Sequence, residues 1–207
     1  MFATKILEER KSKFNGNLRV LRTFGMGTYI QAEGLTQSGG IVETIWKQTI
    51  KQVKKVKPIV GNCLILGFGG GTVAKLLSKY WLGSSIRGID IDPIIVELGE
   101  KYLGVDKKDV AIKIGDAMKE LKGSSEKYDL IIVDLYNGDN YPEVFETDSF
   151  INLTKHHLTY DGTIIFNRLY YGDKRPRAVK FGNKLKKSFS EVTWFYPEAN
   201  LMFLCSN

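Results

Sequence analysis

The stretch NCLILGFGGGT, residues 62–72, decides the fold of this chain. Its first five letters form a short, largely apolar run that predicts a buried strand, and Gly67, Gly69 and Gly71 follow at alternate positions. Residues 73–81 then show helical periodicity. Glycines between a strand and a helix permit a tight turn and let a ligand approach the backbone and the helix N-terminus. Glycine-rich turns of this kind also occur where they serve packing alone, so the motif by itself does not establish that a ligand binds.

Strand-like and helix-like segments alternate along the rest of the chain. The expected strands are residues 86–91, 110–114, 128–135, 162–167, 192–196 and 201–205. The expected helices are residues 93–103, 147–157 and 174–187. Near-continuous apolar strands that alternate with helices predict a parallel sheet covered on both faces. Residues 197–200 are too few for a parallel crossover, so the last two strands should form an antiparallel hairpin.

The segment before this alternation has a different character. Residues 17–37 are strand-like, with glycines as punctuation, and predict a short β-hairpin. Residues 41–57 predict an amphipathic helix. We therefore expect two parts, a short N-terminal β segment over residues 1–40 and one α/β domain over residues 41–207.

The 207-residue chain carries a net charge of +7, and two segments account for it. Residues 46–57 hold five lysines and residues 174–187 hold seven basic residues, with no acid in either segment. Without them, the rest of the chain is at −5. In both segments apolar residues recur at helical spacing, which favours solvated helix faces. A polyanion site, for RNA or an acidic partner, stays open as the alternative.

Composition limits the class of protein further. Hydrophobic residues make up 43% of the chain. No run of about 18 apolar residues occurs, so we expect a globular protein that does not span a membrane. Cys63 and Cys205 lie in apolar runs and should be reduced thiols, as in a cytoplasmic protein. His156 and His157 lack the spacing of metal ligands, so no metal site is predicted.

Acidic residues follow three of the expected parallel strands. Asp90 lies 19 residues beyond Gly71, and Asp116 and Asp134 follow later strands. Ligands of open α/β sheets bind at these strand ends. Asp90 is placed to accept hydrogen bonds from a ribose, and Asp116 either accepts from an adenine amino group or caps the next helix. Acids at three strand ends suit a ligand with a ribose, an adenine and a cationic centre, and disfavour a pyrophosphate.

Four motifs together resemble class I S-adenosylmethionine-dependent transferases, and among them the spermidine synthase-like proteins. The matching stretches are LILGFGGGT at 64–72, GIDIDP at 88–93, GDA at 115–117 and YDLIIVD at 128–134. The resemblance implies a Rossmann-like class I methyltransferase sheet of seven mostly parallel strands with a reversed last strand. It covers residues from about 29 to 167.

The resemblance also implies roles for individual residues. The cofactor, S-adenosylmethionine or its decarboxylated form, would be bound by Gln37, Gly67, Phe68, Gly69, Gly71, Asp90, Ile91, Asp116, Ala117 and Asp134. Asp134 matches the acid that positions and deprotonates the attacking amine in aminopropyl transfer, and Tyr136 is the second expected catalytic residue. Members of the family are often dimers, so a homodimer is an expected assembly.

Two motifs depart from those of spermidine synthases. Where these proteins carry Tyr-His-Glu, the chain has Trp46, Lys47 and Gln48, and their Asp-x-x-Asp here runs from Asp134 to Asn137. An added lysine and two lost acids work against binding a polycation. We therefore expect an S-adenosylmethionine-dependent methyltransferase that acts on a small molecule. The alternative is an aminopropyltransferase of polyamine biosynthesis that uses decarboxylated S-adenosylmethionine, and a second alternative is a non-catalytic protein that binds RNA or another polyanion.

Nucleic acid is a less favoured methyl acceptor than a small molecule. Enzymes that methylate amino groups of bases carry Asn/Asp-Pro-Pro-Tyr/Phe where this chain has Asp-Leu-Tyr-Asn at 134–137. Cytosine C5 enzymes need a catalytic cysteine, and neither Cys63 nor Cys205 is near this loop in the sequence. The sequence therefore leaves the acceptor unnamed and favours a small molecule.

Overall fold

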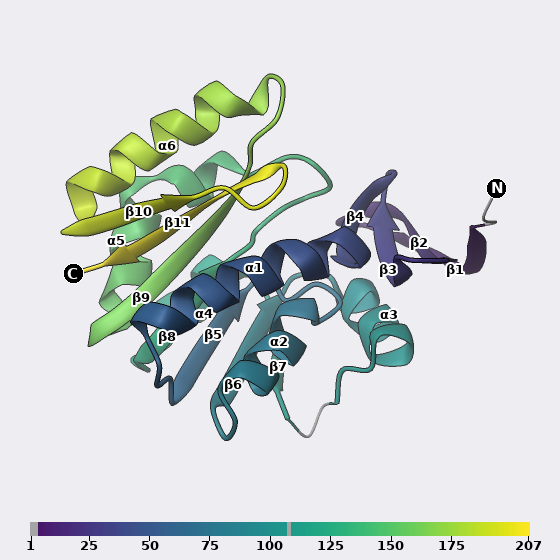
Figure 1. Cartoon of the computed structure of the whole chain (residues 1–207), viewed down its shortest axis with the longest axis horizontal. Coiled ribbons are helices and arrows are strands. Elements are labelled where there is room, and N and C mark those ends of the chain that lie inside the picture. The colour runs from purple at the N-terminus through teal and green to yellow at the C-terminus, as the bar shows by residue number, and fades with distance from the viewer. Residues whose placement is uncertain (1–3, 107–108) are drawn as a thin grey trace.

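The computed structural model describes residues 4–106 and 109–207 and contains two β-sheets. A four-stranded antiparallel sheet is formed near the N-terminus, and a seven-stranded sheet with helices on both faces forms the larger part of the molecule (Figure 1). The α/β, Rossmann-like architecture predicted from the alternation of strands and helices is confirmed.

The large sheet has the strand order β10-β11-β9-β8-β5-β6-β7. Its strands are β5 (Asn62–Leu66), β6 (Ser85–Asp90), β7 (Ala111–Ile114), β8 (Tyr128–Val133), β9 (Leu158–Leu169), β10 (Glu191–Phe195) and β11 (Asn200–Ser206). Neighbours from β7 to β9 are parallel, whereas β11 is antiparallel to both β9 and β10, which confirms the C-terminal hairpin. Because β6 and β8 flank β5 on opposite sides, the strand order reverses at β5, where open α/β sheets bind ligands.

Helices cover the two faces of this sheet as separate layers. They are α1 (Gly40–Val56), α2 (Thr72–Tyr80), α3 (Pro93–Leu103), α4 (Ala117–Lys122), α5 (Asp148–His156) and α6 (Lys174–Ser188), with a short 3-10 helix η1 (Glu143–Glu146). One apolar cluster joins α1, α2 and α3 to the sheet around Trp46 and Ile50, and a second joins α4, α5 and α6 around Phe150 and Phe181. Each buried Leu, Ile or Phe side chain stabilises these layers by about 1.5–3 kcal/mol.

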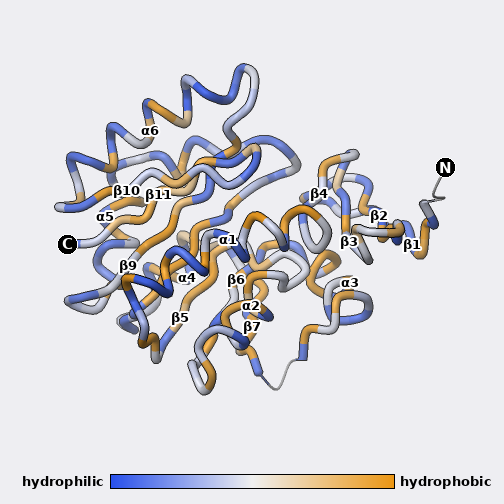
Figure 2. The backbone as a smooth tube through the Cα atoms, viewed as in Figure 1, coloured by the Kyte–Doolittle hydropathy of each residue, from blue (hydrophilic) through white to orange (hydrophobic). Residues whose placement is uncertain are grey.

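The two basic segments fold as amphipathic helices, as predicted. Ile50 of α1 and Leu185 of α6 are buried, whereas Lys51 and Lys187 of the same helices are exposed. Figure 2 shows apolar and polar stretches alternating along both helices. Because α1 and α6 cover opposite faces of the sheet, their lysines do not form one continuous basic groove.

The N-terminal sheet is larger than the predicted hairpin. Its strands β1 (Lys5–Ser12), β2 (Gly16–Thr23), β3 (Gly27–Ala32) and β4 (Leu35–Gly39) pair in chain order. The prediction over residues 17–37 missed β1 because its sequence, KILEERKS, has no clear apolar alternation. β1 is held by its antiparallel pairing with β2 and by polar contacts to α3, since Glu8 accepts hydrogen bonds from Lys101 Nζ at 2.6 Å and from the Tyr102 hydroxyl at 2.7 Å.

Cys63 and Cys205 are buried free thiols, as predicted. Burial raises the pKa of Cys63 to about 12, which keeps this thiol protonated. Within residues 4–106 and 109–207, no helix is both long and apolar enough to cross a bilayer. The same residues contain no group of His, Cys, Asp or Glu arranged to hold a metal ion.

Candidate active site

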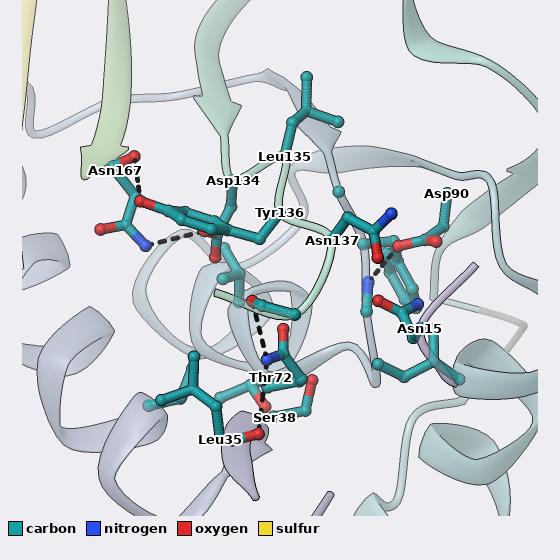
Figure 3. A pocket seen from close by; sticks show the side chains of 18 of the residues that line it. Asn15, Leu35, Ser38, Thr72, Asp90, Asp134, Leu135, Tyr136, Asn137 and Asn167 are labelled. Atoms are coloured by element: carbon teal, nitrogen blue, oxygen red, sulfur yellow. Dashed lines mark hydrogen bonds between the residues drawn. The ribbon is translucent and has the colours of Figure 1, made fainter. Parts of the chain in front are cut away.

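A cavity of about 550 Å³ lies at the carboxyl ends of β5, β6, β8 and β9 (Figure 3). Residues of α1 and of the N-terminal sheet complete its wall. Among the described residues of this wall there are four carboxylates, Asp90, Asp116, Asp134 and Glu198, and no Lys, Arg or His. In a chain with a net charge of +7, this distribution makes the cavity suitable for a cationic ligand.

The fold brings nearly all of the predicted site residues to this wall. Those that line the cavity are Gln37, Gly67, Phe68, Gly69, Asp90, Ile91, Asp116, Ala117, Asp134 and Tyr136. Gly71 is absent from the wall. It has a left-handed φ of 78° just before α2, and a Cβ there would collide with Val105 and Phe68. Gly71 therefore shapes the turn and its packing instead of presenting a surface to a ligand.

The other glycines of the turn bring the backbone close to the cavity. Gly67 has a φ of 86°, and an added Cβ would collide with the carbonyl of Asp134. The N–H of Gly69 donates to Asp90 Oδ2 at 2.6 Å, and the N–H of Gly70 donates to Ser38 Oγ at 2.7 Å. Hydrogen bonds thus hold the turn to the end of β6 and to the end of β4.

Asp90 anchors the glycine turn and can still accept further hydrogen bonds. It ends β6 and is only 9% exposed, and its second oxygen accepts the N–H of Asp92 at 2.9 Å. Burial raises the pKa of Asp90 to about 6 and outweighs these backbone hydrogen bonds. Each carboxylate oxygen has a further lone pair, so Asp90 is able to accept ligand hydroxyls.

Two of the strand-end acids cap helices. Asp92 accepts the N–H of Ile94 at 2.9 Å at the start of α3. Asp116 accepts the N–H of Lys119 at 2.9 Å at the start of α4. The capping alternative for Asp116 is therefore confirmed. Asp116 also lines the cavity, so capping and a place in the wall are combined in one residue.

Asp134 lies at the end of β8 and is held by two side chains from different elements. Asn167 Nδ2 donates to its Oδ1 at 2.8 Å, and the indole Nε1 of Trp46 donates to its Oδ2 at 3.1 Å (Figure 3 shows the Asn167 contact). Burial raises the pKa of Asp134 to about 6, although both hydrogen bonds oppose this shift. The result is an oriented carboxylate with a pKa suited to exchanging a proton near neutral pH.

The position of Lys47 overturns one argument from the sequence. Trp46 faces the cavity and supports Asp134, but Lys47 lines a separate pocket between α1 and α2, beside Lys75 and Lys79. Successive helix residues point about 100° apart, so the lysine next to Trp46 is directed away from it. The expectation that a lysine would repel a polycation from this cavity is therefore wrong.

Tyr136 is fixed by its hydroxyl. This group accepts the N–H of Leu169 at 2.7 Å and lies 3.3 Å from the carbonyl of Asn167, to which it donates. Burial raises the pKa of Tyr136 well above its ordinary value. Both hydrogen-bonding functions of the hydroxyl are used by backbone groups, so Tyr136 positions the loop after β8 and presents its ring to the cavity.

The N-terminal sheet closes one side of the cavity. Gln37 Nε2 donates to the carbonyl of Gly138 at 3.2 Å and thereby joins β4 to the loop after β8. Asn15, in the turn between β1 and β2, donates to Asp92 Oδ2 at 2.7 Å and also lines the cavity. No pattern in the sequence indicated Asn15, because its place depends on how the two sheets pack.

Three further polar residues of the wall were not predicted from the sequence. Asn167 ends the apolar run of β9, and a polar residue at that strand end was a usable signal. Asn200 donates through Nδ2 to Asn167 Oδ1 at 2.8 Å. Glu198 reaches the wall from the turn between β10 and β11, where the sequence resembles the family less clearly.

The model of the spermine/spermidine synthase domain matches residues 43–196 of the chain. The chain belongs to this family. The match begins within α1 and ends just after β10, so it contains most of the strand-end residues of the cavity.

Relatives of known name agree with this assignment. A probable polyamine aminopropyl transferase of Bifidobacterium longum is 32% identical over 106 residues, which are 51% of this chain and 24% of the relative. A polyamine aminopropyltransferase of Vibrio vulnificus is 32% identical over 108 residues, 50% of this chain and 36% of the relative. The matched parts are thus about a quarter to a third of the length of these relatives.

Solved structures agree on the fold. The crystal structure of spermidine synthase from Thermotoga maritima superposes with a TM-score of 0.79, at 16% identity over 98% of this chain and 72% of that chain. At this low identity the likeness concerns the fold alone. It includes the N-terminal strands, because nearly the whole chain is covered.

The comparisons correct the expected reaction. The sequence favoured a methyltransferase that acts on a small molecule, but the family model is that of spermine/spermidine synthases and the named relatives are aminopropyltransferases. The methyltransferase expectation is wrong, and the aminopropyltransferase alternative is the better supported one. The methyltransferase expectation failed because it treated Lys47 and Gln48 as pocket residues, and neither residue lines the cavity.

Proposed function

We propose that the chain is a polyamine aminopropyltransferase that moves an aminopropyl group from decarboxylated S-adenosylmethionine to an amine. The observation that carries this proposal is the charge of the cavity, whose described wall holds four carboxylates and no basic side chain. Both proposed substrates are cations. S-adenosylmethionine itself carries a carboxylate, for which this wall offers no partner cation, so the decarboxylated form suits it better.

Several wall residues fit decarboxylated S-adenosylmethionine. Gly67 and Gly69 bring half-buried backbone to the cavity, Asp90 offers acceptors for ribose hydroxyls, and Asp116 and Ala117 are the proposed contacts of the adenine. When bound, this molecule would supply a carbon beside a positive sulfur, at which an attacking amine forms an N–C bond while the C–S bond breaks and a neutral thioether leaves.

Asp134 is the proposed catalytic residue. An amine attacks only when its nitrogen lone pair is free, and amines are largely protonated at neutral pH. A carboxylate with a pKa of about 6 is mostly ionised at that pH, so Asp134 attracts the ammonium and accepts its proton. Asn167 and Trp46 hold the carboxylate in one orientation, which reduces the entropy lost in aligning the acceptor.

The test is a titration of the purified chain with decarboxylated and with intact S-adenosylmethionine, followed by an assay for aminopropyl transfer to diamines. We expect the decarboxylated form to bind at least about tenfold more tightly, since the intact form brings a carboxylate to an acidic wall. We also expect formation of the longer polyamine and the thioether. Absence of transfer with every diamine, or tighter binding of the intact form, would contradict the proposal.

Three expectations, about location, assembly and acceptor, stay predictions. They are a cytoplasmic location, a homodimer, and a small molecule as the acceptor in preference to nucleic acid. The placement of α1 and α6 on opposite faces of the sheet supports the last of these, because it divides the basic charge.

A further inference from the structure

Glu198 is a carboxylate of the cavity wall that lies outside the strand-end acids. It belongs to the turn over residues 197–200, between β10 and β11. Its φ is 54°, a left-handed conformation that is unfavourable for a glutamate. Strained backbone of this kind persists where the surrounding structure holds it, and it is concentrated at functional sites.

The turn is tied to Asp134 through a chain of side-chain amides. Asn200 closes the turn by donating its N–H to the carbonyl of Pro197 at 3.1 Å. Its side chain donates to Asn167, which in turn donates to Asp134, each at 2.8 Å. The backbone of the turn that carries Glu198, whose side chain is exposed, is therefore held relative to the proposed catalytic carboxylate.

A second contact holds the carboxylate of Glu198 itself. Gln48 Nε2 of α1 donates to Glu198 Oε1 at 3.2 Å. Gln48 is two residues from Trp46, the donor to Asp134, so α1 contacts both carboxylates. In the part of the chain that the structure describes, no ion pair within 4.0 Å neutralises Glu198, and its negative charge is available to a ligand.

Glu198 also compensates for a loss seen in the sequence. At Asn137, which lines the cavity, the chain carries an amide where spermidine synthases carry an acid, so this position provides no charge for an ammonium group. Glu198 restores one carboxylate, in contact with Gln48 itself. The turn between β10 and β11 therefore contributes a carboxylate to the cavity wall.

We propose that Glu198 determines acceptor specificity by binding the second ammonium group of a diamine whose other nitrogen lies at Asp134. This inference rests on the proposed aminopropyl transfer and adds the residue that distinguishes a diamine from a monoamine. Two separate carboxylates of one wall can bind the two ends of such a molecule, and the same wall includes the apolar side chains of Leu135 and Leu169, which suit its methylene chain.

The test compares wild type with Glu198→Gln, using diamines of increasing length and butylamine as acceptors. Glutamine keeps the length of the side chain and the same backbone strain, so mainly the charge is removed. We expect KM for the best diamine to rise about tenfold, the range expected for a lost charge-assisted hydrogen bond. KM for decarboxylated S-adenosylmethionine and kcat/KM for butylamine should change less than about twofold.

Glu191→Gln is the matched control. Glu191 is exposed on β10 of the same hairpin and does not line the cavity, so its substitution changes the net charge equally without touching the wall. It should leave KM for the diamine unchanged. Thermal unfolding of both variants checks that each is folded.

The outcomes separate this inference from the proposed function. If wild type transfers no aminopropyl group to any amine, the proposed function fails and this inference fails with it. If wild type is active and Glu198→Gln keeps its KM for diamines, or loses affinity for decarboxylated S-adenosylmethionine instead, only the role of Glu198 is overturned.

Discussion

The indole Nε1 of Trp46 donates a hydrogen bond to Oδ2 of Asp134 at 3.1 Å, which links α1 to the end of β8. Trp46 is fully buried, so this donor is shielded from water. A hydrogen bond to an ionised carboxylate favours the ionised form. The bond therefore keeps the pKa of Asp134 lower than burial alone would set it.

Trp46→Phe should lower activity mainly at acidic pH. Phenylalanine keeps an aromatic ring but lacks the donor, so the pKa of Asp134 should rise and the acid limb of the kcat profile should move to higher pH. We expect a several-fold loss of kcat below about pH 7 and a smaller loss above about pH 8. The measurement is a pH–rate profile with saturating substrates.

Trp81→Phe provides a matched control for this change. Trp81 is also buried, and its Nε1 donates to the backbone carbonyl of Lys57 at 3.2 Å, away from the cavity. Both variants should lose about 1–3 kcal/mol of unfolding free energy from the lost hydrogen bond and the smaller ring. An equal shift of the pH profile in Trp81→Phe would show that the effect is one of stability alone.

Activity should depend on pH through Asp134. Its pKa of about 6 means that the group loses its proton as pH rises through 6, and only the ionised form accepts a proton from the amine. We therefore expect kcat to rise with pH through about 6. A kcat that is flat from about pH 5 to 8 would show that Asp134 does not act as the base.

The same ionisation should affect stability with the opposite trend. Asp134 has an ordinary pKa of 3.8 and a folded-state pKa of about 6, so the folded chain binds more protons between these values. The free energy of unfolding should therefore fall as pH rises from about 4 to 6, by roughly 3 kcal/mol for this group. In Asp134→Asn this decline should be smaller, as measured by urea unfolding at several pH values.

Loss of the Asp90 carboxylate should strongly weaken the binding of decarboxylated S-adenosylmethionine. Asp90→Ala removes the proposed ribose acceptor and also frees the N–H groups of Gly69 and Asp92. Isothermal titration should show at least about a hundredfold weaker binding of decarboxylated S-adenosylmethionine, since charged acceptors contribute about 1.5–3 kcal/mol and the turn loses its anchor.

Asp129→Ala is the control for Asp90→Ala. Asp129 Oδ2 likewise accepts two backbone N–H groups, those of Gly61 at 2.8 Å and Asn62 at 3.0 Å, but at the opposite end of the parallel strands. Its loss should reduce stability and leave binding unchanged. Comparable loss of binding in both variants would point to general unfolding.

The sequence predicted those parts of the fold and site that depend on local order along the chain. Asp90 and Asp134 follow apolar strands, and parallel strands must bring their carboxyl ends to one edge. A ligand site could therefore be placed there without knowing how the helices pack. Capping was one of the two roles expected of Asp116 for the same reason, because capping involves neighbours in sequence.

Residues that reach the site through long-range packing could not be predicted. Asn15 arrives with an N-terminal sheet whose first strand shows little apolar pattern, and Glu198 arrives through a hairpin at the far end of the chain. The direction of Lys47 was misjudged for a related reason. Its sequence position matches a pocket residue of the family, but its side chain lines another pocket of α1.

Gly67→Ala should strongly destabilise the protein. The residue has a φ of 86°, and the added Cβ would collide with the backbone of Asp134, which cannot move without breaking the hydrogen bond from the N–H of Asp134 to Leu66 O at 2.8 Å. Gly83→Ala separates the two causes, because Gly83 has a similar φ of 79° and open space around it. We expect Gly83→Ala to lose about 1 kcal/mol from backbone strain alone, and Gly67→Ala to lose at least about 3 kcal/mol, with loss of binding of decarboxylated S-adenosylmethionine. Equal losses in urea unfolding would mean that the turn tolerates a side chain at Gly67 and that its glycine serves conformation only.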